Sequence, residues 1–158
     1  MSEILDKLQQ ATTRSLSRLV REALDENMHI LAISEQQDDI MMQFIDNMNY
    51  DFDKLTGKVV EETKVVDFES LELVKDDELN AMVAVEGMVA NARNLHLPSF
   101  ISFNTRLNAL FTEIRINEST NPIDPQQVAT AFSAIISKID LTSAQSIGLY
   151  RTFNQKVL

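Results

Sequence analysis

The residues with the clearest potential for chemistry are Glu26 and His29, three positions apart in a segment of helical periodicity. Residues three apart share one face of a helix, so this carboxylate and imidazole could bind one metal ion. Di-iron helical bundles use the Glu-x-x-His spacing twice, with further carboxylates on facing helices. Here the spacing occurs once, and His96 has no carboxylate three residues before it. A solvent-facing polar pair is therefore favoured, and Glu26 and His29 remain weak metal-ligand candidates.

Two acidic clusters, Asp38-Asp39 and Asp76-Asp77-Glu78, have the oxygen chemistry that hard cations such as Mg²⁺ prefer. Both are expected in or just before the first turn of a helix. Carboxylates are stabilised there by capping and by the helix macrodipole, without any metal. Capping is the favoured interpretation. A site at Glu26 and His29 would need the 38–39 pair to supply its remaining ligands from a facing helix.

Motifs for nucleophilic or phosphate chemistry are missing from the sequence. The chain has no cysteine and only two histidines, and no Gly-x-Ser-x-Gly motif occurs. The sequence Thr56-Gly57-Lys58 lacks both the earlier glycine and the following hydroxyl of a phosphate-binding loop. The sequence therefore predicts no catalytic residue and no cofactor, and a non-enzymatic role is favoured for this chain.

Three arginines, Arg14, Arg18 and Arg21, fall on one helix face and could dock an anionic partner. Acidic residues follow closely between positions 22 and 26. Carboxylates three or four residues away pair readily with arginines on a helix surface. Intrahelical pairing is the favoured interpretation, with a docking surface as the alternative.

The elements that would position these residues are predicted to be helices. Apolar residues recur at three- and four-residue intervals, and only three glycines and three prolines interrupt the chain. The first two segments are joined near Ser34, which predicts an antiparallel hairpin or one long kinked helix. The fold class is therefore all-α, a bundle of five to six helices with an N-terminal helical hairpin. The expected helices cover 3–32, 35–56, 78–95, 98–114, 125–138 and a segment that begins after Thr142 or Ser143.

Several residues mark where these helices begin and end. Gly57 is expected to end the second helix. Asp124 is the predicted N-cap of the fifth, with Pro125 at its first position and Gln127 returning a bond to the cap. Gly87 lies inside the third helix among small residues, where it costs about 1 kcal/mol relative to alanine. A close crossing with a neighbouring helix would explain it.

Composition restricts the class of partner. The 158 residues are 44% hydrophobic and carry a net charge of −10, which disfavours binding to nucleic acid. No apolar run approaches the roughly 20 residues that span a bilayer, so no membrane partner is expected. We expect a cytoplasmic protein and a single domain over 1–158, divided into a hairpin (1–56), an acidic linker (57–75) and a helical bundle (76–158).

The second half of the chain carries recognisable blocks. The first is the segment from Leu71 to Leu97, an acidic stretch followed by a predicted helix that includes Arg93. The others are Asn104-x-Arg106, Asn121-Pro122-Ile123-Asp124-Pro125 and the segment from Leu149 to Leu158. Residues 68–158 thereby resemble a bacterial family of unknown function that is often labelled "thymidine phosphorylase". The resemblance implies that the chain is the N-terminal piece of a longer protein. The label implies a phosphate and nucleoside site, but no residues here match one.

Two functions remain open from the sequence. The favoured one is a helical interaction or assembly module within a larger bacterial cytoplasmic protein, with a protein partner. Self-association into a homodimer through the N-terminal apolar stripe is equally open. The alternative is part of an enzyme that acts on nucleosides or nucleotides, as the family label suggests.

Overall fold

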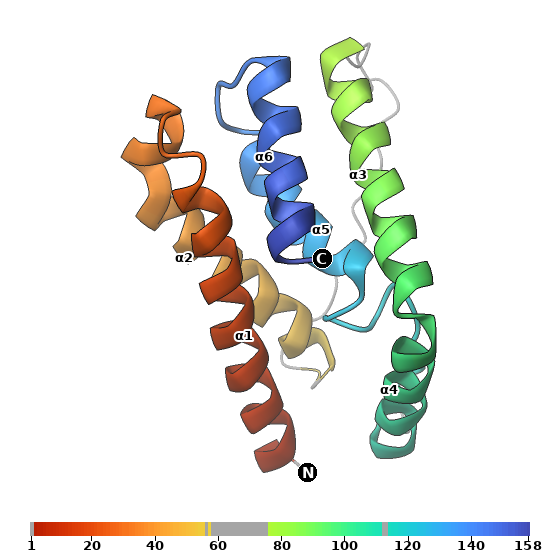
Figure 1. The fold of residues 1–158 in the computed structure, drawn as a ribbon. Coiled ribbons are helices and arrows are strands. Elements are labelled where there is room, and N and C mark those ends of the chain that lie inside the picture. Colours follow the sequence, from red (N-terminus) through yellow and green to blue (C-terminus); the bar gives the residue numbers. More distant parts are fainter. Residues whose placement is uncertain (1, 56, 58–75, 112–113) are drawn as a thin grey trace, which may run out of the picture.

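The computed structural model describes residues 2–55, 57, 76–111 and 114–158 (Figure 1). Within these ranges it contains six helices and no strand, which confirms the predicted all-α bundle. The acidic linker, beyond Gly57, lies outside what the structure describes, and so do the side chains of Asp76 and Asp77, on which the proposed caps depend. The helices are α1 (Ser2–Asp25), α2 (Leu31–Leu55), α3 (Asp76–Leu95), α4 (Leu97–Leu110), α5 (Pro125–Ile136) and α6 (Ser143–Lys156).

Helices α1 and α2 form the predicted antiparallel hairpin (Figure 1), but its turn is earlier than expected. The turn covers residues 26–30, whereas the sequence placed it near Ser34 and left a single kinked helix open. The buried Asn27 side chain donates to the Ala23 carbonyl oxygen at 2.8 Å, which satisfies an acceptor at the end of α1. Ser34 instead lies in the first turn of α2, and its hydroxyl donates to the Leu31 carbonyl oxygen.

The hairpin buries most of its predicted apolar stripe within the same chain. The side chains of Val20 and Leu24 on α1 and of Phe44 and Met48 on α2 are fully buried. Two apolar residues at helical spacing in the first predicted segment are exposed instead, Ile4 by 59% and Leu31 by 69%. Leu31 is exposed because α2 begins there, so it does not continue the α1 stripe. The buried residues of α1, α2, α3, α5 and α6 form one connected cluster.

Aromatic side chains from α5 and α6 occupy the centre of the bundle. The rings of Phe132 and Phe153 are stacked, with centroids 4.2 Å apart and planes 8° apart. Tyr150 approaches Phe132 edge-on at 6.0 Å. All three are buried, so they fix α6 against α5 with the offset and edge geometries that aromatic rings prefer.

The predicted helix ends are largely confirmed. Gly57 has φ +72°, a left-handed conformation that favours glycine after a helix. Asp124 caps α5 by accepting from the Gln126 amide, and Thr142 forms a reciprocal capping box with Gln145. The return bond predicted for Gln127 is wrong, because its side-chain amide donates to the Glu118 carbonyl oxygen at 3.1 Å.

The close crossing predicted at Gly87 is also wrong. A Cβ at this position would meet no atom within 4 Å, since Gly87 lies on the exposed face of α3. That helix packs inward against α5 and α6 through Val89 and Ala92, both buried. Spacing alone identified the small residues, but it did not show that the opposite face of the helix contacts the bundle.

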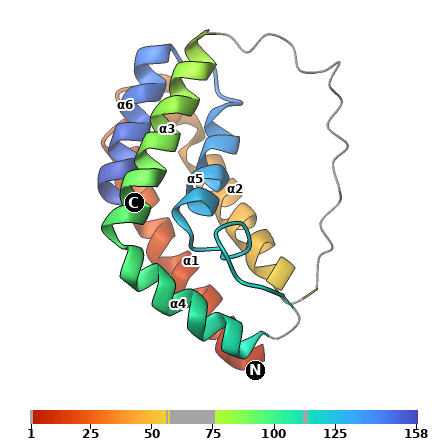
Figure 2. The same cartoon turned by 90° about the vertical axis from the view of Figure 1, so that its right-hand side faces the viewer.

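Helix α4 continues from α3 at one end of the bundle, and it runs antiparallel to α1 (Figures 1 and 2). It is shorter than predicted, ending at Leu110 where the sequence extended it to Ile114. Asn108 explains the early end, because its side chain bonds both to the amide and to the carbonyl oxygen of Ile116. Helix α4 packs against α3, and its Leu107 is buried in a second apolar cluster with Leu55 and Ile116, against which Leu8 of α1 also packs.

Candidate functional site

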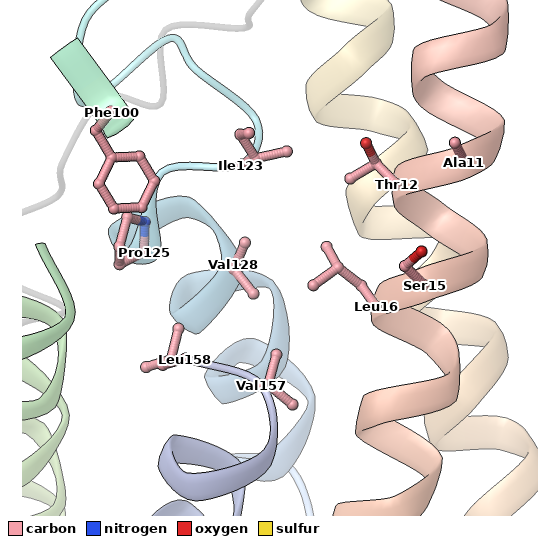
Figure 3. A pocket seen from close by; sticks show the side chains of 10 residues that line it. All are labelled: Ala11, Thr12, Ser15, Leu16, Phe100, Ile123, Pro125, Val128, Val157 and Leu158. Carbon is pink, nitrogen blue, oxygen red and sulfur yellow. The ribbon is translucent and has the colours of Figure 1, made fainter. Parts of the chain in front are cut away.

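An apolar groove of about 370 Å³ opens between α1, the first turn of α4, the start of α5 and the end of α6 (Figure 3). This volume falls within the range of small-ligand and peptide-anchor pockets. Figure 3 shows the α1 side chains on one side and those of the other elements facing them. The groove is lined by Ala11, Thr12, Ser15, Leu16, Phe100, Ile123, Pro125, Val128, Val157 and Leu158.

A second, much smaller depression of about 10 Å³ lies between the same two helices. There the start of α1 faces the end of α4, with Leu5 and Leu8 opposite Leu107 and Phe111. Because the helices are antiparallel, the depression and the groove follow the same pair of walls. From Ile4 to Leu16 on α1 the distance is about 18 Å at the usual helical rise. We call this whole surface the α1–α4 groove.

The polar chemistry in the α1–α4 groove is sparse. Among the residues that line its wide part, only Thr12 and Ser15 carry hydrogen-bonding side chains, and no lining side chain is ionisable. Neither hydroxyl has a hydrogen-bond partner within the part of the chain described here, and Ser15 is exposed. Such a surface can bury apolar groups and orient them with two hydroxyls, but it presents no acid, base or nucleophile pair.

A polar cluster lies directly behind this groove. Arg93 on α3 contacts Asp124 on α5, with Nη2 and Oδ1 2.7 Å apart. Glu118 also approaches the guanidinium, at 3.5 Å. The hydrogen bond to Asp124 raises the pKa of Arg93, opposed by partial burial and supported by the charges of Asp124 and Glu118. The Arg93 Nε atom is buried without a partner among the described residues.

Two asparagines extend this polar cluster to α4. The fully buried Asn121 donates its side-chain amide to Asn104 Oδ1 at 2.7 Å. Its own Oδ1 accepts from the Ile123 amide at 3.0 Å, which fixes the loop before α5. Arg93, Asn104, Asn121 and Asp124 all lie in the motif blocks on which the resemblance depends. Only the cap at Asp124 was predictable for this cluster; its links to Arg93 and, through Asn121, to Asn104 had no signal in the sequence pattern.

The candidate metal ligands are not arranged as the sequence suggested. Glu26 and His29 lie in the turn between α1 and α2, not on a helix, and both are exposed. Glu26 pairs with Lys156 at the end of α6, with Nζ and Oε1 3.1 Å apart. Asp38 and Asp39 are exposed in the interior of α2, beyond its first turn. Among the described residues no three groups of metal-ligating type come together.

The three α1 arginines also differ from the expectation. Arg14, Arg18 and Arg21 are exposed, and none lies within 4.0 Å of a carboxylate in the described part of the chain. The intrahelical pairing favoured from the sequence is therefore wrong. Asp25 instead accepts a hydrogen bond from Gln37 on α2, at 2.7 Å.

The fold and the groove define an all-α domain with an open apolar groove between α1, α4, α5 and the end of α6. The chain belongs to the family described as "Protein of unknown function (DUF1631) N-terminal domain", whose model matches residues 1–158. This match extends the resemblance to the first half of the chain, and it does not confirm the thymidine phosphorylase label. No curated protein and no solved structure matches the chain. In the ranges that the structure describes, no helix has the length and apolarity of a membrane span.

Proposed function

We propose that this domain is a non-enzymatic interaction module that binds a helix of a protein partner in the α1–α4 groove. The observation that carries the proposal is the open apolar groove between α1 and the first turn of α4, with a smaller apolar depression between the same antiparallel helices. Amphipathic helices bind other proteins by laying their apolar face into such a groove, with anchors at helical spacing. An 18 Å wall accommodates about three helical turns.

The exposed apolar side chains beside the groove support the same function. Ile4 on α1 and Leu110 on α4 lie at opposite walls and are 59% and 37% exposed. A bound helix would cover both of them together with the groove floor. Scattered apolar residues are ordinary on protein surfaces, but apolar residues gathered along one groove mark an interaction site.

A homodimer is a second arrangement of the same function. The apolar stripe of the hairpin, which the sequence offered as its interface, is buried inside the chain at Val20, Leu24 and Phe44. A dimer would therefore have to use the α1–α4 groove or the exposed apolar side chains of α3, among them Met82 and Val83. The proposal places the domain in a larger bacterial cytoplasmic protein, supported by the resemblance of residues 68–158 to a bacterial family.

Site-specific photocrosslinking tests the proposal. A photoreactive phenylalanine analogue replaces exposed Ser15 in the groove, and a matched variant carries it at exposed Gln36 on α2. We expect a discrete protein adduct from position 15 alone, in cells that express the full-length protein. An adduct of twice the chain mass would identify the homodimer. No adduct, or equal adducts from positions 15 and 36, would contradict binding in the groove.

A further inference from the structure

The charges of this chain are segregated between the groove and the rest of the molecule. The net charge is −10, yet the stretch from Lys7 to Arg21 and helices α4, α5 and α6 contain no aspartate or glutamate. The same segments carry seven lysines and arginines. These are the elements that form the walls, floor and end of the α1–α4 groove. The wide part of the groove therefore lies on a basic face of an acidic protein, while Glu3 and Asp6, both exposed on α1, flank the depression at its end.

Arginines occupy the rims of both walls. On α1, Arg14 and Arg18 are each three residues beyond a groove-lining residue, Ala11 and Ser15 respectively. On α4, Arg106 is one turn before Leu110, which lines the depression. Residues at this spacing are neighbours on a helix surface.

All three rim arginines are exposed and free of carboxylates. Arg106, like Arg14 and Arg18, has none within 4.0 Å among the described residues. Because the groove is open to solvent between them, three guanidinium groups are available to whatever occupies it.

We propose that the occupant is an acidic amphipathic helix, with its apolar face in the α1–α4 groove and carboxylates along both edges. This inference rests on the proposed function and adds the chemistry of the partner. Guanidinium groups bind carboxylates with a two-pronged geometry that lysine does not offer. Carboxylates on both flanks of the partner helix would meet Arg14 and Arg18 on one rim and Arg106 on the other.

The overall negative charge does not prevent this recognition. Charges farther than about 8 Å are screened at physiological ionic strength, so the rim arginines dominate the field within the groove. Repulsion between the net negative charge of this chain and an acidic partner instead disfavours partners that lack an apolar face, because they bury no apolar surface to offset the repulsion. Nucleic acid fits poorly, since its affinity depends on many phosphate contacts and this chain is acidic elsewhere.

The test measures the affinity of two labelled peptides for the full 158-residue chain by fluorescence anisotropy. The first is an idealised helix of about 18 residues, long enough to fold, with leucines at helical spacing and glutamates on both flanks. The second replaces every glutamate with lysine. We expect the acidic peptide to bind at least about tenfold more tightly, as charge complementarity at a docking site provides.

Two variants and a control locate the binding. The double variant Arg14→Ala/Arg18→Ala should lower the affinity for the acidic peptide by about fivefold or more. The charge-matched double variant Arg115→Ala/Lys138→Ala should leave this affinity unchanged. Ser15→Trp fills the groove from an exposed position and should abolish binding of the acidic peptide. Circular dichroism of each variant verifies that the bundle is intact.

Three outcomes would overturn the inference. Equal binding of both peptides, lost in Ser15→Trp, would contradict an acidic partner while leaving the groove as an interaction site. Binding of the acidic peptide that is unchanged in Ser15→Trp would contradict the assigned location. Binding to anionic phospholipid vesicles, sensitive to Arg14→Ala/Arg18→Ala, in the absence of peptide binding would contradict a protein partner. Failure of the proposed function itself is measured separately, because it would appear as the absence of a specific crosslink from position 15.

Discussion

The carboxylate of Asp124 joins two helices that are distant in the sequence. Its Oδ1 accepts from Arg93 Nη2 on α3 at 2.7 Å and from the Gln126 amide, in the first turn of α5, at 2.9 Å. The Asp124 side chain is 2% exposed and that of Arg93 is 23% exposed. Pro125 and Val128, which follow this cap, form part of the groove floor. The ion pair therefore positions the groove as well as the helix.

Replacing Asp124 should destabilise the domain. Asp124→Ala removes the α5 cap and leaves a partly buried guanidinium without its main partner, so we expect a loss of about 3 kcal/mol in the free energy of unfolding. Asp124→Asn keeps an acceptor for the Gln126 amide and should cost less. Urea denaturation measures both, with Asp140→Ala, at an exposed carboxylate, as the control. Equal stability of Asp124→Ala and Asp140→Ala would contradict a structural role for the pair.

Asp124 also shows which features of the fold are predictable from sequence. Its role as a cap follows from Asp-Pro before an apolar periodic run, a local pattern with a local cause. The hairpin turn was misplaced because Met28 to Ile33 continues the apolar periodicity of α1. The Asn27 side chain ends the helix there by bonding to the Ala23 carbonyl, a competition with the backbone that periodicity does not reveal.

Because Gly87 is exposed, we expect the opposite of what a close helix crossing at this position would imply for a larger side chain. It lies in the helical conformation with open space around its Cβ position, so Gly87→Ala should stabilise the domain by about 0.5 to 1 kcal/mol. The paired variant is Gly57→Ala, which also meets open space but has φ +72° and should destabilise by about 1 kcal/mol. Midpoints of urea denaturation distinguish the two signs. Destabilisation by Gly87→Ala would indicate that something covers this face of α3.

We expect the domain to lose stability at alkaline pH because the Tyr150 side chain is buried. Burial of its side chain raises its pKa to about 12, above the ordinary value of 10.0. Between these values the unfolded chain releases the phenolic proton while the folded chain retains it, so stability falls as pH rises. The full contribution is present below about pH 10, and about 2 kcal/mol is lost by pH 12.

The comparison of Tyr150→Phe with Tyr50→Phe tests this assignment. Tyr50 is 42% exposed and lies on α2, so Tyr50→Phe is the control for the loss of a tyrosine hydroxyl as such. Tyr150→Phe removes the titrating group and should flatten the dependence of unfolding free energy on pH between about 10 and 12. A slope that persists in Tyr150→Phe would assign the effect to other groups.

The α1–α4 groove could not be predicted from the sequence, and the reason is physical. Periodicity identifies an apolar face, but it does not say whether a neighbouring element covers that face. Leu16 and Phe100 belong to apolar helix faces, yet both are only partly buried and line an open groove between helices more than 80 residues apart. The unpaired arginines were missed for a related reason, because carboxylates at pairing distance in sequence bonded elsewhere, as Asp25 does with Gln37.

The partly buried hydrogen bond between Asn104 and Asn121 should couple α4 to the loop before α5. Each single alanine variant leaves the other amide without its partner, so each should cost about 1 to 3 kcal/mol. Asn121→Ala should cost more, because it also removes the acceptor of the Ile123 amide. In the double variant both partners are absent, and a double-mutant cycle should give a coupling of about 1 kcal/mol. Asn117, exposed in the same loop, provides a control pair with Asn104. Simple additivity of Asn104→Ala and Asn121→Ala would mean that this contact does not hold α4 in place beside the groove.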